Sequence, residues 1–226
     1  MPIELVVFDL AGTTVKDDKD VHKVLQKALA AHGVNVSIDD ANTVMGIPKP
    51  VAIRQLLGLR YMGPKDITPE WINEIHVLFV REMIHFYKTD PGVGEKLGVT
   101  ETFKKLKQSN LMVAVDTGFD RQITAPLLDR LGWKSLIDAS VTSDEVERGR
   151  PYPDLIFRAM QLTNITDARN VAKVGDTISD VEEGKAAGCG WVVGVTTGSF
   201  TREQLLDAKP THLIENVSEL LAILSI

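Results

Sequence analysis

The strongest constraint on the fold is an alternation of short apolar runs with amphipathic segments. Four runs are rich in β-branched residues and apolar on both faces: 3–8, 111–115, 170–174 and 191–195. Such strands are typical of a parallel sheet covered by helices on both faces. Helical periodicity follows at 101–108, 122–131, 152–162, 180–187 and 217–225. The alternation predicts an α/β fold with a Rossmann-like, doubly wound parallel sheet and right-handed crossovers.

The alternation stops between about residues 16 and 92, where the pattern is helical throughout. Apolar spacing there predicts helices over 21–32, 38–44, 50–57 and 70–87. A helical block of ~75 residues between the first two strands indicates an inserted domain. We expect a core of residues 1–16 and 91–226 and an inserted α-helical domain of residues 17–90.

Composition limits the class of partner. The 226 residues carry a net charge of −6 with scattered basic residues, which argues against nucleic acid or an anionic membrane as the main partner. No apolar run approaches a membrane span, and the first residues lack the features of a secretory signal. A single cysteine, Cys189, cannot form an internal disulfide. We expect a cytoplasmic protein that acts on a small molecule.

Polar clusters directly follow three of the predicted strands: 9–14 (DLAGTT), 116–118 (DTG) and 175–180 (GDTISD). Open α/β sheets bind ligands at the carboxyl ends of their strands. One Asp at a strand end is usually a helix cap or turn former, but three clusters at one edge indicate a site.

The carboxylates in these clusters predict a metal. Bringing Asp9, Asp176 and Asp180 into one crevice is electrostatically costly without a cation. Hard oxygen ligands with no nearby His or Cys favour Mg²⁺, bound together with a phosphoryl group of the substrate.

Candidate phosphoryl-binding groups lie in the same clusters. Thr117 and the backbone amides around Gly12 and Gly118 would form a small anion-binding nest. Arg150, in the sequence GRPYP, precedes a proline suited to opening a helix, and its guanidinium fits a forked phosphate contact.

Together these motifs resemble the four-part signature of the haloacid dehalogenase superfamily. They are the DxxGT start, a Thr-Gly after an apolar strand, a basic residue before PxP, and GDTxxD. The resemblance covers almost the whole chain and implies a Rossmann-like core with a helical cap inserted after the first strand.

The resemblance also implies residue roles. Asp9 would be the nucleophile that takes up the phosphoryl group as an aspartyl-phosphate. The implied Mg²⁺ ligands are Asp9, the backbone carbonyl of Ala11 and Asp176, with Asp180 supporting the site. The implied catalytic residues are Asp9, Lys49, Thr117 and Arg150, of which Thr117 and Arg150 would steady the phosphoryl group. The implied substrate-binding and phosphoryl-binding residues are Gly12, Thr13, Lys49, Thr117, Gly118 and Arg150.

Ala11 departs from the superfamily's phosphatase pattern, in which a second Asp two residues after the nucleophile acts as general acid. Ala inside DxAGTT, Arg150 in the third motif and the segment 45–54 (MGIPKPVAIR) all resemble phosphonoacetaldehyde hydrolases, the phosphonatases. In that resemblance Lys49 falls on the Schiff-base lysine.

This combination of Ala11 and Lys49 has a chemical reason. When a C–P bond breaks, the leaving group is a carbon anion, so protonating an oxygen does not help. An iminium formed by the Lys49 amine accepts those electrons as an enamine. Pro50 favours a helix start beside Lys49, where the helix dipole lowers an ammonium pKa. The competing interpretation is an exposed cap lysine that only steers the phosphoryl group.

Two departures from the phosphonatases concern polar groups. The family carries a histidine three residues beyond the lysine, where this chain has Ala52. It carries a tyrosine after the Thr-Gly, where this chain has Phe119. Proton handling or aldehyde recognition must therefore differ here.

Three functions compete at this stage. The first is Mg²⁺-dependent cleavage of the C–P bond of a small 2-oxoalkylphosphonate. The alternative is a phosphatase for a small phosphorylated metabolite such as phosphoglycolate or a sugar phosphate. The third is a non-catalytic phosphometabolite-binding module. Exposed apolar positions on the helical cap are compatible with a homodimer.

Overall fold

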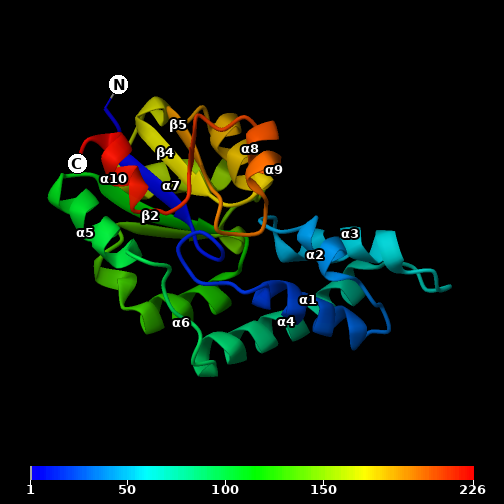
Figure 1. The fold of residues 1–226 in the computed structure, drawn as a ribbon. Coiled ribbons are helices and arrows are strands. Elements are labelled where there is room, and N and C mark those ends of the chain that lie inside the picture. The colour runs from blue at the N-terminus through cyan, green and yellow to red at the C-terminus, as the bar shows by residue number, and fades with distance from the viewer. Residues whose placement is uncertain (1) are drawn as a thin grey trace.

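The computed structural model describes residues 2–226 and is built around a six-stranded, all-parallel sheet (Figure 1). The strands lie in the order β3-β2-β1-β4-β5-β6. Their bounds are β1 Leu5–Asp9, β2 Met112–Thr117, β3 Ala139–Thr142, β4 Val171–Gly175, β5 Trp191–Val195 and β6 His212–Ile214. The predicted doubly wound parallel sheet is confirmed.

Strands β3 and β6 were not predicted from the sequence. β3 is four residues long and half polar, and β6 is three residues long and begins with His212. Neither forms an apolar run, because both lie at the edges of the sheet. The four predicted strands start and end within two residues of the observed ones.

Helices cover both faces of the sheet, as the alternation of side chains in β1 requires. Val6 and Phe8 face the cluster that includes α5, α6 and α10, whereas Leu5 and Val7 face α7 and α8. The bounds are α5 Val99–Gln108, α6 Arg121–Leu131, α7 Asp154–Thr163, α8 Ile178–Ala187, α9 Arg202–Asp207 and α10 Glu219–Leu224. The short helix α9, which buries Leu205, was not predicted.

Four further helices are inserted between β1 and β2 and form a cap beside the core, on the side away from both termini (Figure 1). They are α1 Asp20–Ala30, α2 Ile38–Asn42, α3 Lys49–Arg60 and α4 Pro69–Thr89. Ser37 and Asp40 form a capping box on α2, and Arg60 holds the Asp40 carboxylate at 2.8 and 2.7 Å. The helical insertion is confirmed, while its boundaries at residues 17 and 90 stay a prediction.

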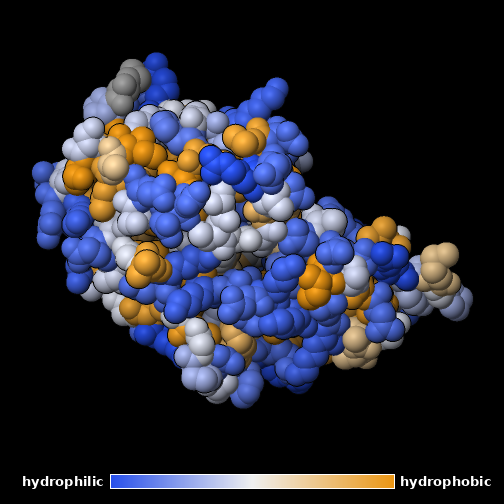
Figure 2. Space-filling model, in the orientation of Figure 1, coloured by the Kyte–Doolittle hydropathy of each residue, from blue (hydrophilic) through white to orange (hydrophobic). Residues whose placement is uncertain are grey.

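Hydrophobic side chains on the visible face form small groups separated by hydrophilic ones (Figure 2). The exposed apolar residues of the cap are Val51, Leu59, Met62 and Val77. A homodimer through this surface stays a prediction. Among residues 2–226, none of the helices combines the length and the apolar character needed to cross a bilayer.

Candidate active site

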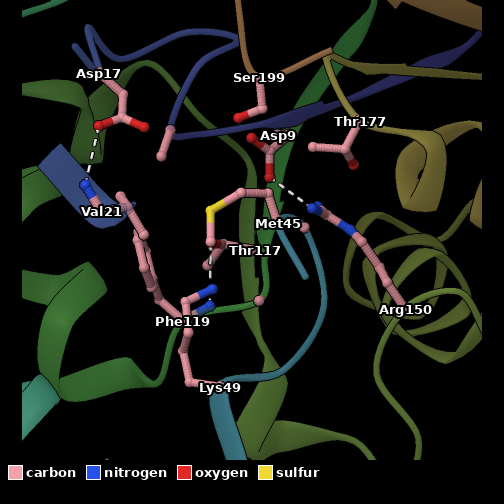
Figure 3. Close-up of a pocket in the computed structure, with 13 residues that line it drawn as sticks. Asp9, Asp17, Val21, Met45, Lys49, Thr117, Phe119, Arg150, Thr177 and Ser199 are labelled. Atoms are coloured by element: carbon pink, nitrogen blue, oxygen red, sulfur yellow. Dashed lines mark hydrogen bonds and ion pairs between the residues drawn. The ribbon is translucent and has the colours of Figure 1, made fainter. Parts of the chain in front are cut away.

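A pocket lies between the carboxyl ends of the central strands and the cap (Figure 3). Its lining from the core is Asp9, Ala11, Thr117, Gly118, Phe119, Arg150, Thr177 and Ser199. Its lining from the inserted segment is Asp17, Val21, Met45, Gly46 and Lys49. The structure thus brings together six of the residues singled out from the sequence: Asp9, Ala11, Lys49, Thr117, Gly118 and Arg150.

Arg150 lines the pocket but is almost completely buried, and acidic side chains surround its guanidinium. Its Nη1 donates to Oδ1 of Asp9 at 2.6 Å, and its Nε donates to Oε2 of Glu183 at 2.9 Å. Its Nη2 donates to the backbone oxygen and the carboxylate of Asp116. Every nitrogen of the guanidinium therefore has a protein acceptor. A contact between Arg150 and a phosphate, as expected from the sequence, would require Arg150 to give up one of these hydrogen bonds. The observed geometry instead favours a role for Arg150 in orienting the Asp9 carboxylate.

Lys173 is a second buried cation in this network, which sequence reasoning missed. Its Nζ contacts Asp116 and lies 3.1 Å from both Asp180 and Glu183. Burial opposes the ionisation of Asp116, but Arg150 and Lys173 hold its pKa below the usual value. In this network four carboxyls surround the two cations Arg150 and Lys173: Asp9, Asp116, Asp180 and Glu183. Burial raises the pKa of Glu183 to about 8.

Asp176 is fully buried and does not line the pocket, and two of the predicted residues, Gly12 and Thr13, contact it. Thr13 donates its hydroxyl to Oδ1 of Asp176 at 2.8 Å, and the backbone amide of Ser199 donates to Oδ2 at 2.7 Å. Gly12 adopts a φ of +94°, and a Cβ there would lie 2.5 Å from Oδ2. Gly12 and Thr13 therefore hold a candidate metal ligand and do not line the pocket.

The carboxylates fit a divalent cation. Burial, together with repulsion from Asp180 and Asp176, raises the pKa of Asp9 to about 8. Burial and the charge of Asp180 raise the pKa of Asp176 to about 6. A bound cation would relieve this repulsion and keep both groups ionised. Asp9, Asp116 and Asp180 also place one oxygen each within 4.8 Å of one another, consistent with a metal site. Asp116, however, already contacts Arg150 and Lys173, so we interpret it as an anchor for these cations.

Lys49 is the first residue of α3 and is 3% exposed. Its Nζ donates weakly to the carbonyl of Ile47 at 3.4 Å and lies 5.3 Å from the centroid of the Phe119 ring and 5.9 Å from that of Phe79. Burial, reinforced by the charge of Arg150, lowers the pKa of Lys49 to about 8. The alternative in which Lys49 is exposed is therefore wrong, while the choice between imine formation and steering of the phosphoryl group stays open.

Glycines allow the loop before Lys49 to approach the core. A Cβ on Gly118 would lie 2.8 Å from the carbonyl oxygen of Ile47, and one on Gly149 would lie 2.3 Å from Cγ of Pro48. These contacts leave no room for a side chain at either glycine. They fix the start of α3, and with it Lys49, over the carboxyl ends of the strands.

The two positions where the chain departs from the phosphonatases are apolar and buried. Ala52 is fully buried, and Phe119 packs against Phe79 and Tyr87 with ring centroids 6.3 and 6.0 Å apart. The amine of Lys49 therefore faces aromatic rings, which explains the large effect of burial on its pKa.

The fold and this site define a family, and comparisons with known proteins agree. The model of the haloacid dehalogenase-like hydrolases matches residues 6–194. The chain therefore belongs to the haloacid dehalogenase-like hydrolase family.

Within that family the chain is similar to phosphonoacetaldehyde hydrolases. It is 32% identical to the enzyme of Bacteroides fragilis, over 94% of this chain and 82% of the relative. It is 30% identical to the enzyme of Bacillus cereus, over 96% of this chain and 86% of the relative. The crystal structure of a phosphonoacetaldehyde hydrolase-like protein from Oleispira antarctica has the same fold, with a TM-score of 0.86 at 23% identity, covering 100% of this chain and 92% of that one.

Proposed function

We propose that the protein cleaves the C–P bond of a small 2-oxoalkylphosphonate through an imine on Lys49 and an aspartyl-phosphate on Asp9. The observation that carries this proposal is the buried amine of Lys49, which lines the same pocket as the Asp9 carboxylate. A lysine with a pKa of about 8 has a substantial free-amine fraction near neutral pH, which imine formation requires.

In this reaction Lys49 activates the substrate carbonyl and Asp9 accepts the phosphoryl group. The Lys49 amine condenses with the substrate carbonyl, and water leaves. The Asp9 carboxylate attacks phosphorus, the C–P bond breaks, and its electrons move into the iminium to give an enamine on Lys49. Protonation of the enamine carbon and hydrolysis of the imine release the carbonyl product, and water then hydrolyses the aspartyl-phosphate to phosphate.

Other pocket residues would position these groups. Arg150 orients Asp9 through its 2.6 Å hydrogen bond. Thr117 and Gly118 line the pocket, and the Thr117 hydroxyl and the backbone at Gly118 would bind phosphoryl oxygens. Mg²⁺ would be held by Asp9, the carbonyl of Ala11 and Asp176, with Asp180 in support, and would supply the positive charge that lets an anionic substrate approach Asp9.

Measurements of phosphate release distinguish C–P bond cleavage from the alternative function, hydrolysis of a phosphate monoester. We would assay a panel of 2-oxoalkylphosphonates and phosphate monoesters with Mg²⁺, using the natural chain and Lys49→Arg, which keeps the charge but forms no imine. The proposal expects phosphate from a carbonyl phosphonate, and its loss in Lys49→Arg with unchanged Mg²⁺ affinity. Release from monoesters alone, unaffected by Lys49→Arg, would instead identify a phosphomonoesterase.

A further inference from the structure

Asp17 lies in the segment between β1 and α1 and lines the pocket together with Asp9 and Lys49 (Figure 3). Its Oδ1 accepts hydrogen bonds from the backbone amides of Asp20 at 2.7 Å and Val21 at 3.1 Å. Within residues 2–226, Oδ2 has no hydrogen-bond donor. One oxygen therefore fixes the side chain, and the other stays free for a ligand.

We propose that Asp17 relays protons between Lys49 and the carbonyl oxygen of the substrate during imine formation. This inference rests on the function proposed above. Imine formation needs a group that both accepts and donates protons, and Ala11, Ala52 and Phe119 cannot do so.

A single carboxylate can carry out every proton transfer of imine formation. Asp17 takes a proton from the Lys49 ammonium, and the free amine forms a C–N bond with the carbonyl carbon. Asp17 then exchanges protons between the nitrogen and the oxygen to give a carbinolamine, and it donates a proton to the hydroxyl, which leaves as water. Two of the three ammonium protons depart in that water, the nitrogen becomes an iminium, and Asp17 ends as a carboxylate.

The electrostatic setting of Asp17 suits such a relay. Burial raises the pKa of its carboxyl, and burial lowers the pKa of Lys49. The two values approach each other, which lowers the cost of moving a proton between the groups. Six charged or titratable groups influence Asp17 or are influenced by it: Asp20, His22, Lys23, Lys49, Tyr87 and Lys96.

Other groups near Lys49 fit this role less well. Burial raises the pKa of Tyr87 well above 10, so its hydroxyl does not accept and return protons near neutral pH. Asp120 lies 3.2 Å from Nε2 of His76 and does not line the pocket. Asp9 is needed as the nucleophile.

Borohydride trapping tests the relay, with Asp17→Asn against a matched control. Asn keeps the Oδ1 acceptor that caps α1 but moves no proton. Asp18→Asn makes the same change at the next, exposed position. With a 2-oxoalkylphosphonate and borohydride, we expect the adduct on Lys49 to form about 100-fold more slowly in Asp17→Asn and at the natural rate in Asp18→Asn. In Asp17→Ala, added formate should restore part of the rate, which a purely structural role would not explain.

The outcomes distinguish the two proposals. Equal trapping rates in the natural chain and Asp17→Asn would overturn the role of Asp17 while leaving the imine intact. Absence of any adduct from the natural chain, with phosphate still released, would overturn the imine and the relay together.

Discussion

Nη1 of Arg150 donates to Oδ1 of Asp9 at 2.6 Å, so the candidate nucleophile is bonded to a fully buried cation. The same guanidinium contacts Asp116, Asp180 and Glu183. These bonds restrict the rotation of the Asp9 side chain and leave the site with more carboxyls than cations. This arrangement is consistent with a metal site, and it holds the Asp9 carboxylate in one orientation.

The buried network makes Lys173 a strong contributor to stability. Lys173→Met leaves the carboxyls of Asp116 and Glu183 without one of their two cations, and we expect a loss of about 3–5 kcal/mol in the free energy of unfolding. Lys134→Met is the control, because Lys134 pairs with Asp129 at the exposed surface and should cost less than about 1 kcal/mol. Urea denaturation measures both, and equal losses would contradict the prediction.

Gly12 should be required for metal binding through its contact with Asp176. Gly12→Ala places a Cβ 2.5 Å from Oδ2 of Asp176, and we expect about 10–100-fold weaker Mg²⁺ binding by calorimetry. Gly33 also has a positive φ, of +79°, but a Cβ there meets nothing within 4 Å among the described residues. Gly33→Ala should lose about 1–2 kcal/mol of stability and keep its Mg²⁺ affinity. Unchanged affinity in Gly12→Ala would refute the coupling.

Lys49 should reduce the stability of the folded protein. Because burial lowers its pKa from 10.5 to about 8, Lys49→Met should raise the free energy of unfolding by about 3 kcal/mol at pH 7. The unfolded chain binds more protons than the folded one between pH 8 and 10.5, so the stability of the natural chain rises across that window. The gain in the free energy of unfolding from Lys49→Met is therefore largest below pH 8 and disappears above pH 10.5. Thermal unfolding at several pH values tests this, with exposed Lys104→Met as the control.

Ala11 separates the two candidate reactions. Ala11→Asp supplies a carboxylic acid at the pocket, where it would protonate the leaving oxygen of a phosphate ester. We expect hydrolysis of alkyl phosphate monoesters to rise by at least about 10-fold, and C–P cleavage to gain nothing. A natural chain that already hydrolyses alkyl phosphates as fast as Ala11→Asp would contradict the assigned role of Ala11.

The main elements of the fold and six of the 13 residues that line the pocket could be predicted from sequence, because apolar runs fix the strands and their ends fix Asp9 and Thr117. The edge strand β6 could not be predicted, because three residues are too few to show an alternation of apolar and polar side chains. The pairing of Lys173 with Asp116 joins different strands, and local pattern does not report it. A lysine inside the apolar run 170–174 was nevertheless a signal, because a buried lysine requires an acidic partner. Asp17 depends on how the chain enters the cap, which only the structure defines.

The most direct test is the location of the imine. The protein would be mixed with Mg²⁺, a 2-oxoalkylphosphonate and borohydride, digested, and its peptides analysed by mass spectrometry. We predict a reduced adduct on Lys49 that forms only with the carbonyl substrate and is absent from Lys49→Arg. Steady release of phosphate from the same phosphonate, with Lys49 unmodified after every quench, would contradict C–P cleavage through Lys49.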